Sequence, residues 1–110
     1  YDDGEQLRDF IHVNDCSAIN FWFYKNFQHK GIFNVGTGNA VSFNDIANCI
    51  INIHGKGKIN YIEFPDGLKE AYQSYTQSDD RKLRSIYNKK FTSLEDGIKK
   101  YYQSFINKQR

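Results

Sequence analysis

The sequence contains no methionine, one proline and only two cysteines among its 110 residues. Because it begins at Tyr1 without an initiator methionine, we expect a fragment, a processed product or an incomplete gene model. Cys16 and Cys49 lie far apart, and neither has a histidine or cysteine at metal-ligand spacing. We expect both to be reduced, buried thiols, with a disulfide or a metal pair as the alternative. The chain therefore predicts no metal site.

Long apolar runs are also missing. No stretch of about 18 apolar residues is present, so no membrane-spanning helix is expected. No charged start followed by an apolar stretch and a small-residue cleavage site is visible, so no signal peptide is predicted. The 15 basic and 13 acidic residues give a net charge of +2, whereas nucleic-acid binders carry a clustered basic excess. We therefore expect neither a membrane nor a nucleic acid as a partner.

Strand and helix patterns alternate along the chain. Short β-prone runs predict strands over 8–13, 31–35 and 59–64, and apolar periodicity predicts helices from 15 to about 26, 42 to about 54, 77 to about 86, and from 92 onward. This order predicts an α/β fold with parallel strands as the default. Three short strands make a poor free-standing sheet, so we expect at least one to pair with strands outside these residues.

Capping residues support the predicted helix starts. Asn14 or Asp15 can accept the free amide hydrogens of the first helix. Ser42 precedes the second helix, and Asp45 follows three residues later in a capping-box arrangement. Thr92, with Glu95, opens the last helix in the same way. Asp15 is thus interpreted as a cap rather than a catalytic acid.

Two motifs resemble the extended short-chain dehydrogenases that modify nucleotide sugars. Residues 8–15, RDFIHVND, are similar to the RDF(V/I)(Y/H)V-x-D motif of that superfamily, and residues 32–38, IFNVGTG, are similar to its strand and glycine turn. A narrower resemblance lies in residues 62–68, IEFPDGL, and 72–79, YQSYTQSD. Together with the Leu-Arg pair at 83–84, these resemble the pattern of ADP-glyceromanno-heptose 6-epimerases. The resemblance runs over essentially the whole chain.

Two features of such enzymes are absent here. Dinucleotide binding needs a glycine-rich turn that places the pyrophosphate at a helix N-terminus, but no G-x-x-G-x-x-G occurs, and the glycine turn at 36–38 is too short to replace it. The Tyr-x-x-x-Lys pair of the family is also missing. The resemblance therefore implies that residues 1–110 are a single partial domain, the C-terminal substrate-binding portion, without the N-terminal Rossmann domain and without catalytic or cofactor-binding residues.

The resemblance also implies a reaction. The parent enzyme would be an isomerase that inverts C6″ of ADP-heptose by transient oxidation and reduction, with NADP bound by the missing N-terminal domain. It would act in the cytoplasm, in the synthesis of lipopolysaccharide core precursors, as a homo-oligomer, and the fragment alone would be inactive. Another nucleotide-sugar epimerase or dehydratase, or a non-catalytic remnant of a broken gene, remains as an alternative.

Two residues are the candidate substrate contacts. Arg8 keeps its charge and can pair bidentately with phosphate oxygens, and in the family the arginine of this motif faces the nucleotide diphosphate. Tyr72 occupies a family position that contacts the substrate. The structural alternatives are an ion pair between Arg8 and Asp9 and simple packing of the Tyr72 ring. We also expect the isolated chain to be poorly stable, because its strands and first helix should expose apolar faces.

Overall fold

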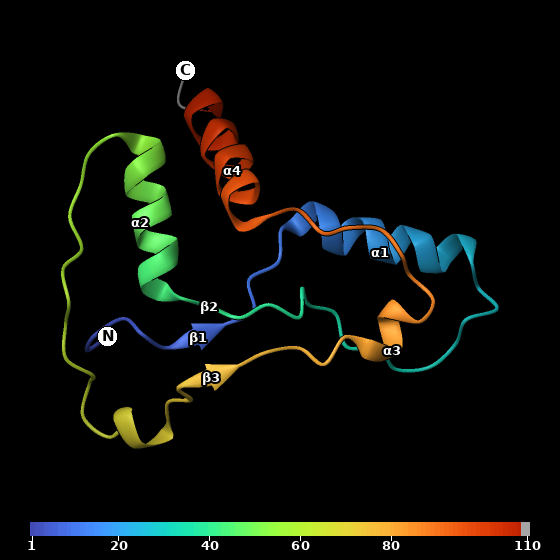
Figure 1. The fold of residues 1–110 in the computed structure, drawn as a ribbon, viewed down its shortest axis with the longest axis horizontal. Helices are drawn as coiled ribbons and strands as arrows, with labels where there is room; N and C mark the ends of the chain where they lie inside the picture. The colour runs from blue at the N-terminus through green and yellow to red at the C-terminus, as the bar shows by residue number, and fades with distance from the viewer. Residues whose placement is uncertain (109–110) are drawn as a thin grey trace.

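The computed structural model describes residues 1–108, which form four α-helices and a small sheet (Figure 1). The helices are α1 (Val13–Lys25), α2 (Phe43–His54), α3 (Arg81–Arg84) and α4 (Leu94–Lys108), with a 3₁₀ turn at Lys69–Ala71. The strands are β1 (Leu7–Arg8), β2 (Val41–Ser42) and β3 (Tyr75–Thr76). Figure 1 shows α2 and α4 side by side at one end, and α1 with α3 at the other. None of the helices described is long and apolar enough to cross a membrane.

The sheet is mixed, with β1 in the middle. β2 pairs with β1 antiparallel, and β3 pairs with it in parallel, placing Leu7 beside Tyr75 and Arg8 beside Thr76. The α/β prediction and the presence of a parallel pair are therefore confirmed. All three predicted strands were wrong in whole or in part. The segments 31–35 and 59–64 lie outside the sheet, and of 8–13 only Arg8 belongs to a strand, since β1 ends there and Val13 already begins α1. Their side chains favour β structure, but a strand also needs a ladder of backbone hydrogen bonds, and the segment 59–64 has only one such bond to another segment among the described residues, from the Asp2 amide to the Ile62 carbonyl at 2.8 Å.

The capping predictions are partly confirmed. The box at the start of α2 forms as expected: Ser42 Oγ accepts from the Asp45 amide at 3.0 Å, and Asp45 Oδ2 accepts from the Ser42 amide at 2.9 Å. At α1 the prediction was wrong, because the His12 ring caps the helix by accepting the Asn14 amide at 3.1 Å.

Asp15 does not cap α1 as predicted but links α1 to the start of α4. Asp15 accepts both the amide and the hydroxyl of Thr92, at 2.8 and 3.0 Å, and so joins the first turn of α1 to the start of α4. Thr92 is occupied by this contact, and Ser93 rather than Thr92 accepts the Asp96 amide in the first turn of α4. The helix predicted from 77 to about 86 is shorter in the structure, where α3 covers only Arg81–Arg84. Residues 75–76 pair with β1, and the Ser78 amide donates to Asp9, so the chain before α3 is not helical.

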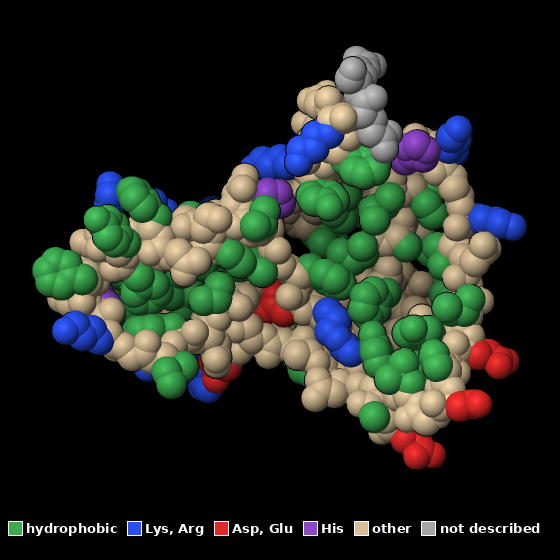
Figure 2. Space-filling model, turned by 180° about the vertical axis from the view of Figure 1, so that it is seen from behind, with side chains coloured by type: hydrophobic (Ala, Val, Ile, Leu, Met, Phe, Trp, Pro, Cys, Tyr) green, Lys and Arg blue, Asp and Glu red, His purple; other side chains and the backbone are tan. Residues whose placement is uncertain are grey.

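The fully buried apolar core is small. It consists of Ile19 on α1, Leu83 on α3 and Tyr87, with Trp22 and other aromatic side chains packed around them. The Cα radius of gyration is 16.8 Å and the extents are 48 × 42 × 19 Å, whereas a compact domain of this length has a radius near 13 Å. Many large apolar side chains stay exposed (Figure 2). Both cysteines are free thiols, half-buried rather than fully buried.

Candidate functional site

The structure brings Arg8 and Tyr72 together. Arg8 is the last residue of β1, and Tyr72 lies three residues before β3, beyond the Leu7–Tyr75 end of the parallel ladder. The Arg8 side chain reaches back along the ladder to the Gln73 carbonyl and the Tyr72 ring. The Arg8 guanidinium carbon is 4.9 Å from the centre of the Tyr72 ring, which is cation–π distance. The sequence predicted both residues separately, and their contact depends on the β1–β3 pairing that it did not predict.

The charge of Arg8 has no carboxylate partner among residues 1–108. Its guanidinium donates to the carbonyl oxygens of Leu7 at 2.7 Å and Gln73 at 2.6 Å. The ion pair with Asp9, considered as the structural alternative, does not form, because the side chain of Asp9 is engaged elsewhere. A guanidinium has five N–H donors, so Arg8 keeps both positive charge and donors for a ligand.

Tyr72 also belongs to an aromatic cluster. Its ring centre is 5.1 Å from that of Phe64 and 6.1 Å from that of Tyr1, and Tyr1 stacks on Phe64 at 4.8 Å. Packing thus explains part of the role of Tyr72. Its hydroxyl forms no hydrogen bond with the part of the chain that the structure describes, and this oxygen and its proton remain free for a ligand.

Asp9, the residue after β1, joins its own segment to the glycine turn and to the residues after β3. One carboxylate oxygen accepts the Thr37 amide at 2.8 Å and the Thr37 hydroxyl, and the other accepts the amides of Gly38 at 2.8 Å and Ser78 at 3.2 Å. Burial raises the pKa of the Asp9 carboxyl, but the hydrogen bonds from Thr37, Gly38 and Ser78 outweigh it and hold the pKa below 3.8. Sequence reasoning missed this role, although RDF and GTG were the two motifs that it singled out.

The glycine turn fits closely against this carboxylate. A Cβ built on Gly36 would lie 2.3 Å from Ser78 Cβ and 2.7 Å from Asp9 Oδ2, so only glycine allows the approach. Since the amides of Thr37 and Gly38 already donate to Asp9, they are not available to a pyrophosphate. No helix begins at the turn either, because α2 starts only at Phe43. These residues do not fit a dinucleotide cofactor.

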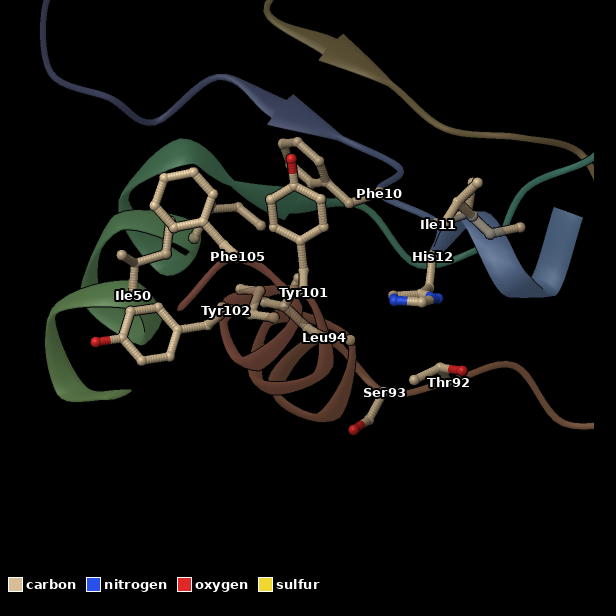
Figure 3. Close-up of a pocket in the computed structure, with 14 residues that line it drawn as sticks. Phe10, Ile11, His12, Ile50, Thr92, Ser93, Leu94, Tyr101, Tyr102 and Phe105 are labelled. Carbon is tan, nitrogen blue, oxygen red and sulfur yellow. The ribbon is translucent and has the colours of Figure 1, made fainter. Parts of the chain in front are cut away.

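A second feature is an apolar groove of about 580 Å³ (Figure 3). It lies between α2, α4 and the residues that lead from β1 into α1, and Phe10, Ile50, Tyr101 and Phe105 are among its walls. No lysine, arginine, aspartate or glutamate lines it, so its polar side-chain groups are limited to His12 and the hydroxyls of serine, threonine and tyrosine residues. The described residues also hold no cluster of histidine, cysteine, aspartate and glutamate that could bind a metal ion.

Comparison with known sequences supports the motif resemblance. The family model "NAD dependent epimerase/dehydratase family" matches residues 1–36. The chain is 48% identical over 96 residues to ADP-L-glycero-D-manno-heptose-6-epimerase of Brachyspira hyodysenteriae. That match covers 86% of this chain and 30% of the relative, so the chain spans less than a third of the curated relative's length.

Comparison with solved structures supports the fold. UDP-N-acetylglucosamine 4-epimerase from Methanobrevibacter ruminantium M1 superposes with a TM-score of 0.83 at 24% identity, covering 98% of this chain and 34% of that one. UDP-glucuronic acid 4-epimerase from Bacillus cereus gives 0.76 at 24% identity, covering 100% and 35%. The predicted resemblance is therefore confirmed: the chain is similar over 86% of its length to an ADP-L-glycero-D-manno-heptose-6-epimerase, and residues 1–36 match the NAD dependent epimerase/dehydratase family model.

Proposed function

We propose that residues 1–110 form the substrate-binding portion of an ADP-heptose 6-epimerase. The whole protein would invert C6″ of the sugar by transient oxidation and reduction. The identity of 48% to an enzyme of that name supports the substrate class. The observation that carries the proposal is the Arg8 guanidinium, which has no carboxylate partner among residues 1–108 and lies beside Tyr72.

Arg8 suits a diphosphate because its N–H donors and permanent charge match phosphate oxygens. Its two backbone contacts fix the guanidinium without neutralising it. Tyr72 adds a hydroxyl donor beside the guanidinium, and the rings of Phe64 and Tyr1 pack against that side chain. In this proposal, the pair binds the ADP diphosphate and orients the sugar, and it performs no proton or hydride transfer.

The nicotinamide cofactor, which we propose is NADP, would be bound by another part of the protein, since the Gly36–Gly38 turn does not fit it.

The segment 31–35 is suited to pair with this cofactor-binding part of the protein. Ile32 is 87% exposed and Val35 42% exposed on an extended segment that lies outside the sheet, and Phe27 nearby is 76% exposed. A strand from the cofactor-binding part would pair with this segment and cover its apolar side chains. We further propose a cytoplasmic homo-oligomer acting in lipopolysaccharide core synthesis.

The test is titration calorimetry on the complete natural chain that carries these residues, with ADP-heptose, ADP and a UDP-sugar. Replacing Arg8 with alanine removes a charged contact, and we expect ADP-heptose affinity to fall about 10- to 100-fold. Tyr72→Phe should lower it about fivefold. The control is Arg81→Ala, because Arg81 is exposed and pairs with Asp79, and it should leave the affinity unchanged.

Three outcomes would count against the proposal. Unchanged affinity in Arg8→Ala would remove Arg8 from the site. Tighter binding of the UDP-sugar than of ADP-heptose would favour another nucleotide-sugar enzyme. Failure of the wild-type chain to bind any nucleotide sugar would favour a non-catalytic remnant. A parallel titration of the 110-residue chain with NADP should show no binding.

A further inference from the structure

The β1–β3 pairing is too short to fix the position of Tyr72 by itself. Only two residue pairs form the ladder, Leu7 with Tyr75 and Arg8 with Thr76. Tyr72 lies beyond the end of this ladder and is half-buried. A short ladder with exposed residues, such as Tyr75 at 56% exposure, specifies register weakly. Other contacts must therefore hold the segment 72–78 against β1.

Two neighbouring residues of the β1 segment provide such contacts at opposite ends of 72–78. Arg8 donates to the Gln73 carbonyl at 2.6 Å and lies against the Tyr72 ring. Asp9 accepts the Ser78 amide at 3.2 Å. β3 lies between these two anchors. A shift of β3 along β1 would therefore have to break both of them together.

Asp9 is the stronger anchor because it is itself fixed on a third segment. Its carboxylate accepts two amides and a hydroxyl from Thr37 and Gly38, in addition to Ser78. The close approach of Gly36 to Ser78 leaves no room for the turn to move towards 78. Hydrogen bonds to a charged acceptor are roughly twice as strong as neutral ones. The turn, β1 and the segment after β3 thus form one rigid unit.

We propose that Asp9 is a positioning residue for substrate binding, which sets the register of β3 on β1 and thereby holds Tyr72 against the Arg8 guanidinium. This inference rests on the proposed function for its effect on substrate affinity. The placement of the Tyr72 ring, however, can be measured without any substrate. In this proposal Asp9, which follows β1, does not touch the substrate, because its two carboxylate oxygens are already occupied by Thr37, Gly38 and Ser78.

The first test measures the placement directly, in the complete natural chain with labelled arginine. The Nε–H resonance of Arg8 should carry a ring-current shift from Tyr72, which Tyr72→Leu identifies by removing the ring. In Asp9→Asn one carboxylate oxygen becomes an NH₂ group, which cannot accept the amide that faces it. We expect the Arg8 resonance to move most of the way towards its position in Tyr72→Leu. An Arg8 resonance unchanged by Asp9→Asn would overturn the proposal.

The second test is a double-mutant cycle on ADP-heptose affinity with the same chain. Asp9→Asn should weaken binding about tenfold when Tyr72 is present, but less than about twofold when Tyr72 is already leucine. A tenfold loss in both backgrounds would mean that Asp9 acts only through general stability, and the proposal would fall. If the wild type binds no nucleotide sugar, the proposed function fails, and the Arg8 resonance still decides the role of Asp9.

Matched variants guard against a folding defect. Thr37→Val removes only the hydroxyl donor and keeps both amides of the turn, so it should give a smaller shift and a smaller affinity loss in the same direction. Ser78→Ala should have no effect, because Ser78 contributes its amide, and its buried hydroxyl has no partner in residues 1–108. Glu63→Gln removes the same charge from an exposed site and should also have none. An effect of Ser78→Ala as large as that of Asp9→Asn would contradict the register argument.

Discussion

Replacing Leu83 with alanine should unfold the 110-residue chain, or come close to it. Leu83 is 0% exposed, and its core contains only two other buried apolar residues within 1–108, Ile19 and Tyr87. A Leu→Ala change at such a site costs about 2–5 kcal/mol, from lost burial and from the cavity that remains. Because few other residues form this core, we expect Leu83→Ala to lower the free energy of unfolding by about 3 kcal/mol.

That loss is large relative to the stability that this chain can have. The solvent-accessible surface is 8372 Å², whereas a compact monomer of this mass exposes roughly 6,300 Å². The excess of about 2,000 Å² is as large as the surface that a standard protein–protein interface buries in total. A chain with this much surface left uncovered should fall at or below the usual lower limit of about 5 kcal/mol. A partner that covers it would restore the missing stability.

Urea unfolding followed by tryptophan fluorescence checks this reasoning. Trp22 is the only tryptophan, and it packs against the core, 5.6 Å from the Tyr87 ring. Leu83→Ala should abolish the transition or move it to the lowest urea concentrations. The control Ile62→Ala alters a side chain that is 62% exposed and should change the free energy of unfolding by no more than about 0.5 kcal/mol. Equal effects of the two substitutions, or a sharp transition unchanged by Leu83→Ala, would refute the argument.

Two further predictions concern polar contacts. Ser42→Ala should lower the free energy of unfolding by about 1–2 kcal/mol, because it breaks the capping box of α2. The control Asn48→Ala on the same helix should be neutral or slightly stabilising. Equal urea midpoints for the two variants would contradict this prediction. Asp9 has a folded-state pKa below 3.8, so its stabilising effect is present above about pH 4 and is lost as the pH falls through the folded value. The unfolding free energy of wild type should thus drop more steeply than that of Asp9→Asn as the pH falls below about 4, and parallel pH profiles would show that Asp9 contributes nothing.

Helices governed by local chemistry were predicted well from the sequence. α2 begins at the predicted Ser42–Asp45 box and ends at Gly55, whose φ of 84° is one that glycine adopts easily. The apolar stripe of α1 was also read correctly, with Ile19 buried and Trp22 against the core. In each case the deciding contacts lie within a few residues of one another. Periodicity and capping chemistry act over that range, so the sequence contains the necessary information.

The remaining structure depends on contacts between residues far apart in the chain. Asp15 has the chemistry of a helix cap, but its carboxylate accepts the amide of Thr92, 77 residues later, and the His12 ring caps α1 instead. No local pattern can choose between these two uses of an acid. The same holds for the candidate site, where Arg8 meets Tyr72 only because β3 pairs with β1.

The RDF and GTG motifs were recognised in the sequence, but the contact between them was not predicted. Both were recognised as family patterns, one for a ligand contact and the other for a sharp turn. The structure shows that they are two halves of one contact, in which Asp9 accepts the amides of Thr37 and Gly38. The same contact occupies the amides that a pyrophosphate would need, and it leaves Arg8 without a carboxylate partner among the residues described. The Asp9 carboxylate thus gives the glycine turn a structural role. Because Asp9 binds the turn and not Arg8, the guanidinium of Arg8 stays available for a ligand.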